Sequence, residues 1–148
     1  MSETILDHIA YLRKFIPTGQ ISCIIDVIGG EEGQFFRDKL AEIHELIRYY
    51  MPRTYEADGQ GDDAMVYLHY FKRGGDWYIT ERDKMEPQHQ AFGFCNPMGD
   101  MQCAELGYVS IVELLQNNVE LDLYWDPITL GELKSKKLNA DNPHNLAY

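Results

Sequence analysis

The spacing of apolar residues changes at about residue 53, and this change constrains the fold more than any other feature of the sequence. Before it, apolar residues recur every three or four positions, as they do on one face of an α-helix. After it, runs rich in aromatic and β-branched residues alternate with polar ones and are separated by glycine-rich turns. A chain that changes from the helical to the strand period in this way predicts an α+β fold.

Three helices are predicted in the first part, over residues 3–16, 20–28 and 34–51. Ser2 is the expected N-cap of the first helix, and Pro52 ends the third. The β-branched residues of the second helix leave a strand as the alternative there. Cys23 lies in the apolar stripe of this second element, and we expect it to be buried.

The second part predicts five strands and two short helices. A hairpin turn at Gly74 and Gly75 joins the first two strands. Ser110 and Thr129 are the expected N-caps of the helices, over 111–116 and 130–137. The five predicted strands are 65–72, 76–81, 89–95, 102–109 and 119–125.

These elements predict N-terminal helices packed on an antiparallel sheet of about five strands, with short capping helices. We expect one α+β domain over residues 1–137, in which residues 1–53 form the helical part and residues 54–133 an acidic β part. Residues 138–148 are polar and rich in asparagine, which predicts a flexible tail.

Composition and charge exclude several classes of protein. The 148 residues are 45% hydrophobic and 25% charged, which suits a globular core and not a disordered chain. The formal net charge is −11, whereas a protein that binds nucleic acid directly needs a basic face. No apolar run approaches the roughly 18 residues of a membrane helix. Three cysteines, an odd number, indicate reduced thiols, and no leader pattern is present, so we expect a cytoplasmic protein.

The negative charge is concentrated in the β part. Residues 54–133 hold fifteen acids and four bases, whereas residues 1–53 hold eight acids and six bases. No Lys or Arg occurs between Lys84 and Lys134, a stretch of 49 residues that contains eight acids. Like charges on one sheet repel each other, so this composition costs stability. It serves either solubility or the binding of a basic partner protein.

Residues 119–125 alternate strictly, and this pattern predicts where an acidic binding surface would lie. Val119, Leu121, Leu123 and Trp125 are expected on the buried face. Side chains on the other face of a strand are about 6.6–6.8 Å apart, so carboxylates there would form a row that resembles a phosphate backbone. The residues expected to bind the partner are Asp62, Asp63, Glu105, Glu120, Asp122, Tyr124 and Asp126.

Two other sets of residues offer metal ligands without a recognised spacing. The loop 56–63 contains four carboxylates and two glycines but lacks the EF-hand pattern, so a solvated turn is the simpler interpretation. His89, Cys95 and Cys103 match no zinc motif, and Cys95 lies in an apolar strand where it is expected to pack. We therefore assign no metal ligand, no cofactor and no catalytic residue.

An alternative function depends on a pocket near the aromatic hairpin. His69 and Trp77 lie on the two strands of this hairpin, and Glu81 ends the second strand. A His69–Asp76 pair could act in acid–base chemistry, although a hydrogen-bonded histidine in a sheet is the simpler interpretation. These residues would line the pocket of a small enzyme or of a ligand-binding module.

The blocks Trp77-Tyr78-Ile79-Thr80-Glu81, Ala91-Phe92-Gly93 and Glu105-Leu106-Gly107-Tyr108-Val109-Ser110 stand out in the second half of the chain. They resemble blocks of an uncharacterised family of small proteins from phages, plasmids and other mobile elements. The resemblance covers residues 17–133 approximately and brings with it no catalytic residue or cofactor. It implies a setting, because small acidic proteins of such elements often antagonise host defence by binding CRISPR or restriction effectors.

The leading hypothesis is therefore a non-enzymatic acidic binding protein of a mobile element. It would inhibit a basic, nucleic-acid-handling defence protein of the bacterial host, and the sharper version of this hypothesis is that it mimics nucleic acid. The pocket near His69, Trp77 and Glu81 supports the alternative, a small enzyme or ligand-binding module. Self-association through the N-terminal helices is a third hypothesis.

Overall fold

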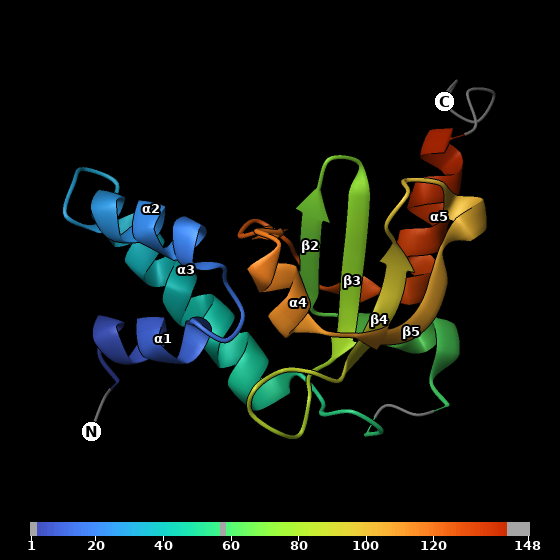
Figure 1. The fold of residues 1–148 in the computed structure, drawn as a ribbon, viewed down its shortest axis with the longest axis horizontal. Helices are drawn as coiled ribbons and strands as arrows, with labels where there is room; N and C mark the ends of the chain where they lie inside the picture. The colour runs from blue at the N-terminus through green and yellow to red at the C-terminus, as the bar shows by residue number, and fades with distance from the viewer. Residues whose placement is uncertain (1–2, 57–58, 142–148) are drawn as a thin grey trace.

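The structure is a computed structural model that describes residues 3–56 and 59–141, and an antiparallel sheet lies at its centre (Figure 1). The sheet has five strands in the order β5-β4-β3-β2-β6, so that β5 and β6 form its two edges. A second sheet of two short strands pairs β1 with β7. The strands are β1 (Met65–Val66), β2 (Leu68–Lys72), β3 (Gly75–Glu81), β4 (Ala91–Asn96), β5 (Glu105–Val109), β6 (Glu120–Leu121) and β7 (Ile128–Thr129).

Helices cover both faces of the large sheet, and the fold is α+β as predicted (Figure 1). The three N-terminal helices and α4 pack on one face, while α5 packs on the other. A π-helical turn over Leu46–Tyr50 continues the third helix. The helices are α1 (Ile5–Leu12), α2 (Thr18–Ile28), α3 (Gly33–Glu45), α4 (Ile111–Gln116) and α5 (Leu130–Asp141).

Two hydrophobic cores share the large sheet. The larger core joins the N-terminal helices and α4 to alternate residues of β2 and β3, among them Leu68, Tyr70 and Ile79. The smaller core lies on the other face, where Tyr78 and Phe94 pack against α5. Because successive residues of a strand point to opposite faces, the same strands serve both cores.

The helix predictions are confirmed in type and differ at their ends. Residues 20–28 belong to a helix and not to a strand, and that helix begins at Thr18, directly after Pro17. The N-cap of α1 is Thr4 and not Ser2, because the Thr4 side chain accepts a hydrogen bond from the Asp7 backbone and Asp7 caps Thr4 in return. Ser2 itself lies outside the described residues. Helix α5 continues to Asp141, so the tail predicted from residue 138 is helical over its first four residues.

Two predicted strands are shorter than expected. Residues 65–72 are interrupted at Tyr67, so that Met65–Val66 pairs with β7 while Leu68–Lys72 enters the large sheet. Met101–Cys103 forms a turn of 3₁₀-helix before β5, where a strand was predicted from residue 102. The Asp100 side chain accepts a hydrogen bond from the Gln102 backbone and holds this turn.

The prediction of a strand over 119–125 is wrong beyond Leu121. The Asp122 backbone N–H donates to the carbonyl of His69, and the Asp122 carboxylate accepts a hydrogen bond from the Tyr124 backbone at 3.0 Å. This local bond turns the chain, as aspartate side chains do in tight turns. Trp125 consequently packs against His69 and Tyr78, on the face opposite Leu121. The expected straight row of carboxylates does not form.

The cysteines differ in their surroundings. Cys23 is exposed, so the prediction that it is buried is wrong. The apolar stripe of α2 is made by Ile21 and Ile24, which face α3 and the sheet instead. Cys95 packs against the larger core as expected, and Cys103 is exposed. None of the described helices is both long and apolar enough to cross a bilayer.

Candidate functional site

The structure distributes the seven residues predicted to bind a partner over three places, which are the β5 edge, a turn beside α5, and β6 with the segment that follows it. Glu105 and Glu120 lie on opposite edges of the sheet, in β5 and β6. Asp62 and Asp63 lie on a 3₁₀ turn beside α5, where the Lys134 ammonium is 2.8 Å from the Asp62 carboxylate. Asp122, Tyr124 and Asp126 follow β6.

The surroundings of that last group carry both signs of charge. Asp122, Tyr124 and Asp126 line a hollow of about 470 Å³ together with Lys136 and Lys137 of α5. The Tyr124 ring also stacks on Phe35, with the Lys39 ammonium 5.9 Å from each ring. The described surroundings of Asp122, Tyr124 and Asp126 are therefore not an uninterrupted acidic face.

His69 connects three segments through its two ring nitrogens. Its Nε2 lies 2.7 Å from the Asp76 carboxylate on β3, and its Nδ1 lies 3.0 Å from the Asp122 carboxylate after β6. The ring stacks on Tyr78 with centroids 4.8 Å apart, and the Trp125 ring lies beside both, 5.1 Å from His69 and 5.7 Å from Tyr78. Both ring nitrogens of His69 are thus engaged with carboxylates of the chain itself, which leaves neither directed at a substrate.

Tyr78 completes this cluster below the His69 ring. Burial, and then the nearby charges of Asp76 and Asp122, raise the pKa of its phenol well above the ordinary value. Its hydroxyl forms no hydrogen bond to any described residue. The cluster therefore favours the interpretation of His69 as a structural connection between β2, β3 and the segment after β6.

The three residues of the alternative pocket do not line one cavity. Trp77 faces the larger core and lines a groove with Cys95 and Glu113, on the α4 side of the sheet. His69 lies on the opposite face, in the cluster described above. Glu81 lines a different pocket near the start of β4.

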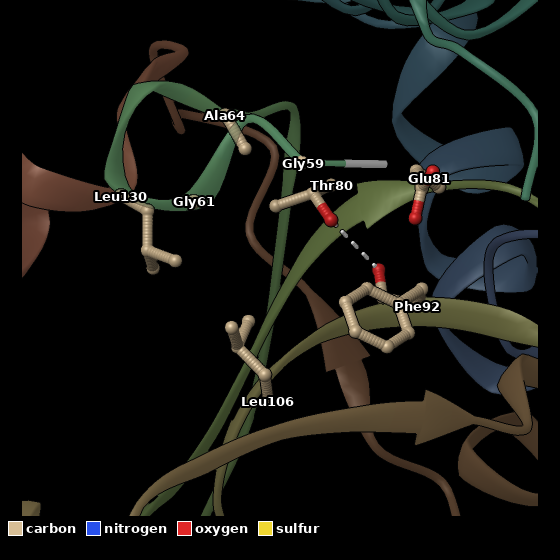
Figure 2. Close-up of a pocket in the computed structure, with 8 residues that line it drawn as sticks. All are labelled: Gly59, Gly61, Ala64, Thr80, Glu81, Phe92, Leu106 and Leu130. Atoms are coloured by element: carbon tan, nitrogen blue, oxygen red, sulfur yellow. Dashed lines mark hydrogen bonds between the residues drawn. The ribbon is translucent and has the colours of Figure 1, made fainter. Parts of the chain in front are cut away.

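The pocket at Glu81 arises from an irregularity in the pairing of β3 with β4 (Figure 2). Ile79 pairs with Gly93 and Glu81 pairs with Phe92, so one extra residue, Thr80, bulges from β3. Because a bulge changes the alternation of side chains, both Thr80 and Glu81 border the same pocket. The cavity measures about 340 Å³, and its lining residues are Gly59, Gly61, Ala64, Thr80, Glu81, Phe92, Leu106 and Leu130.

This pocket combines apolar walls with one buried carboxyl group. Phe92, Leu106 and Leu130 supply apolar walls, and Glu81 is only 3% exposed (Figure 2). The Thr80 hydroxyl donates to the Phe92 carbonyl and does not point free into the cavity. A long side chain with an apolar stem and a cationic end fits such a lining.

The two edge strands of the sheet differ in whether their outer backbone groups are hydrogen-bonded. At β6, the Gln20 side chain of α2 accepts a hydrogen bond from the Leu121 N–H at 2.9 Å and donates one to the Leu121 carbonyl at 2.8 Å. It thus occupies the backbone groups that another strand would use. At β5, the backbone of Glu105, Leu106 and Gly107 pairs with β4 alone among the described residues.

The open edge carries exposed apolar side chains. Leu106 is 44% exposed and Tyr108 is 56% exposed, on the sheet face that also holds the Glu81 pocket. The Tyr108 hydroxyl lies 2.5 Å from that of Tyr55, which is itself exposed. An open edge with apolar side chains is a template for pairing with another extended segment.

The charge next to this edge is negative. Asp100, Glu105 and Glu113 are exposed, and none of them forms an ion pair with a described residue. Burial, and then the charge of Glu105, raise the pKa of the Cys95 thiol to about 11, so this cysteine is a poor nucleophile at neutral pH. Glu105 is the predicted partner-binding residue that this edge retains.

Sequence reasoning missed the features that define this site. The Gln20 side chain caps the β6 edge at Leu121, which lies 101 positions further along the chain, and no local sequence pattern predicts such a contact. The bulge at Thr80 interrupts a run that looks regular, Trp77-Tyr78-Ile79-Thr80-Glu81. Leu106 and Tyr108 are two residues apart in β5, so the sequence places them on one face of that strand. Only the strand order shows that β5 is an edge of the sheet.

The candidate metal ligands from the sequence are not brought together. His89, Cys95 and Cys103 do not converge on one point in the part of the chain that the structure describes. The loop 56–63 is described only in part, because residues 57 and 58 lie outside the described ranges.

Comparison with known proteins adds no relative: no family model, no curated protein and no solved structure matches this chain. The resemblance to proteins of mobile elements therefore stays a prediction.

Proposed function

We propose that this protein binds an extended, basic segment of a partner protein along the open edge β5. The observation that carries the proposal is the contrast between β6, whose outer side the Gln20 amide caps, and β5, where Glu105–Gly107 pair with β4 alone among the described residues. In binding by strand addition, backbone hydrogen bonds supply affinity and pockets for alternate side chains supply specificity. The edge offers both kinds of contact.

The side chains around β5 indicate which residues the partner would present. Leu106 and Tyr108 would contact apolar side chains of the added strand. The neighbouring cavity would accept a Lys or Arg, with its stem along Phe92 and Leu130 and its charged end near Glu81. Glu105 would face a second basic residue.

Charge favours a different, basic protein over a second copy of this chain. The chain carries a net charge of −11, so two copies would repel each other as their edges approached. The 49 residues between Lys84 and Lys134, which include β5 and α4, contain no Lys or Arg. A basic partner would approach faster and bind more strongly at low salt.

The proposed partner is a nucleic-acid-handling defence protein of a bacterial host, such as a CRISPR or restriction effector. Such proteins have basic surfaces for phosphates, which an acidic protein can occupy in place of nucleic acid. This part of the proposal depends on the resemblance to proteins of mobile elements. Occupying the basic surface would inhibit the partner without any chemical step by this chain.

A displayed library of random short peptides tests the binding mode without knowledge of the partner. Selection on the full chain is expected to enrich peptides that alternate apolar with Lys or Arg residues. Affinity should fall steeply between about 50 mM and about 500 mM salt, because exposed charges are screened. Amide shifts in NMR spectra should concentrate in β5 and around the pocket.

A matched pair of double variants locates the site. Glu105→Gln with Leu106→Lys changes β5, and Glu120→Gln with Phe71→Lys makes the same changes near β6, where Phe71 pairs with Glu120. Only the first variant should lose binding. Equal loss in both, or NMR shifts that map to β6, would overturn the assignment to β5. A panel of purified CRISPR and restriction enzymes then tests the partner class, with loss of DNA cleavage as the measured result.

The pocket alone supports a second candidate, the binding of a small cationic ligand. Its volume of about 340 Å³ lies in the range of small-molecule sites, and it holds one buried carboxyl group. A thermal-shift screen of small amines would detect such a ligand. Glu81→Gln should abolish the shift for a true pocket ligand and leave it unchanged for binding elsewhere.

A further inference from the structure

Three potential metal ligands converge in the helical part of the molecule, far from β5. Glu3 precedes Thr4, the N-cap of α1, while His8 lies on α1 and His44 lies near the end of α3. One carboxylate oxygen and one ring nitrogen from each histidine lie within 4.8 Å of one another. His44 is buried at 3% exposure, and the His8 side chain is 15% exposed.

The separations of these atoms fit a shared ion better than direct hydrogen bonds. The Glu3 Oε2 atom lies 3.3 Å from the His44 Nε2 and 3.6 Å from the His8 Nε2. Neither contact is a hydrogen bond among those of the described residues. Ligand atoms about 2.0–2.1 Å from a zinc ion at tetrahedral angles are about 3.3–3.4 Å apart. The oxygen is thus spaced from each nitrogen much as two ligands of such a site are, and all three ligand atoms lie within 4.8 Å of one another.

The neighbouring side chains orient the three ligands. The Arg48 guanidinium donates to Glu3 Oε1 at 2.9 Å, which leaves Oε2 directed at both imidazoles. The His8 and His44 rings lie 4.7 Å apart, and the Tyr11 ring meets His44 edge-on at 4.8 Å. Groups that fix the orientation of a ligand in this way raise the affinity of metal sites.

The protonation of His44 also suits this role. Burial lowers the pKa of the His44 imidazole, with a smaller contribution from the neighbouring His8 and Arg48 charges, while Glu3 acts in the opposite direction. The neutral imidazole, which is the form that binds metals, is therefore favoured.

We propose that Glu3, His8 and His44 form a binding site for one first-row divalent transition-metal ion, of which Zn²⁺ is the best match. Two histidines and one carboxylate leave at least one coordination position open to water. The site would connect the segment before α1 to α3. It is independent of the proposed binding at β5.

The experiment uses the full chain without an affinity tag, stripped of metal by a chelator. Calorimetric titration with ZnCl₂ should show one ion bound per chain, and Co²⁺ should give visible absorption typical of four or five ligands. Zn²⁺ should raise the melting temperature, because it binds the folded chain through residues that come together only on folding.

His8→Ala is the decisive variant, because His8 is only partly buried and its loss leaves the core intact. It should weaken Zn²⁺ binding by about tenfold or more and abolish the Co²⁺ spectrum. His89→Ala is the matched control, since it removes an exposed histidine outside the cluster and should change neither result. Glu3→Gln should behave like His8→Ala while keeping the size of the side chain.

Two results would overturn the proposal. The first is the absence of binding of one Zn²⁺ per chain to the unmodified protein. The second is binding that His8→Ala and His89→Ala weaken equally, which would place the ion elsewhere. If the cluster is only an ion-pair network, His8→Ala will lower stability in the presence of chelator, and Zn²⁺ will not raise the melting temperature of the unmodified chain.

Discussion

The two edges of the large sheet end in opposite ways. Strand β6 has two residues, and the Gln20 amide makes two hydrogen bonds to Leu121 on its outer side. Strand β5 has five residues, exposes Leu106 and Tyr108, and has no equivalent cap over Glu105–Gly107 within the described chain. Since open edges invite association, proteins usually protect them. The protection of only one edge is the reason to assign a function to the other.

The difference arises from where the helices pack. Helix α2 lies beside β6 and supplies Gln20, while the segment after β6 is held by the contact of Asp122 with His69. Helix α5 instead packs on a face of the sheet, where its residues meet Tyr78 and Phe94 (Figure 1). The N-terminal part therefore stabilises one edge, and the acidic part leaves the other exposed.

The largest loss of stability is expected from a substitution in β4, the strand that pairs with β5. Gly93 of β4 pairs with Gly107 of β5, and a Cβ atom at Gly93 would lie 2.1 Å from the Tyr78 carbonyl oxygen. Gly93→Ala should therefore lower the free energy of unfolding by about 3 kcal/mol or more, or prevent folding. Urea denaturation measures the change. A loss below about 1 kcal/mol would contradict this close approach of the backbones.

The next largest loss of stability is expected from removing His69, which holds the segment after β6 through Asp122. His69→Ala removes two hydrogen bonds to carboxylates and leaves Asp76 and Asp122 without their common partner. Because those carboxylates are partly exposed and can be hydrated, we expect a loss of about 2–3 kcal/mol in urea denaturation. Asp126→Ala, at an exposed neighbour of Trp125, is the control and should change stability little. Equal stability of the two variants would show that His69 does not connect these segments.

A smaller loss is expected from opening the β6 edge. Gln20→Ala leaves the N–H and carbonyl of Leu121 without their partner and should cost about 1–2 kcal/mol. It should also promote association, since both edges would then be open, and light scattering measures this. Gln34→Ala removes a glutamine that bonds only to exposed Asp38 and should do neither. A monomeric Gln20→Ala protein would show that the cap does not prevent edge pairing.

The smallest effect is expected at the open edge itself. A Cβ atom at Gly107 would meet no atom within 4 Å, although Gly107 pairs directly with Gly93. Gly107→Ala should leave the protein folded and more stable by about 0.5 kcal/mol, because alanine restricts the unfolded chain. Thermal denaturation measures this gain. A marked loss would mean that something covers this side of β5.

Much of the fold could be predicted because it depends on local patterns. The apolar stripes identified the helices at 20–28 and 34–51, and the glycines at 74 and 75 identified the hairpin. Prediction failed where contacts between residues distant in the sequence overrode the structure that the local pattern favours. The alternation over 119–125 resembled a strand, but Asp122 forms hydrogen bonds with Tyr124 and with His69 on β2 and turns the chain away.

The candidate sites show the same division. The contact of His69 with Asp76 was predicted correctly from the hairpin. The charge pattern also predicted that Glu105 binds a partner, and this stays a prediction. The cap by Gln20 and the cluster of Glu3, His8 and His44 were missed, because each joins residues that are far apart in the chain and carry no spacing motif.

The sequence by itself determined most of the element types, the antiparallel sheet and the concentration of negative charge in the β part, since periodicity and composition depend on each residue and its near neighbours. Only the tertiary structure decided the strand order, and with it which acids share a surface and which edge is open. These properties depend on contacts between distant residues such as Gln20 and Leu121, and such contacts exist only after the chain has packed.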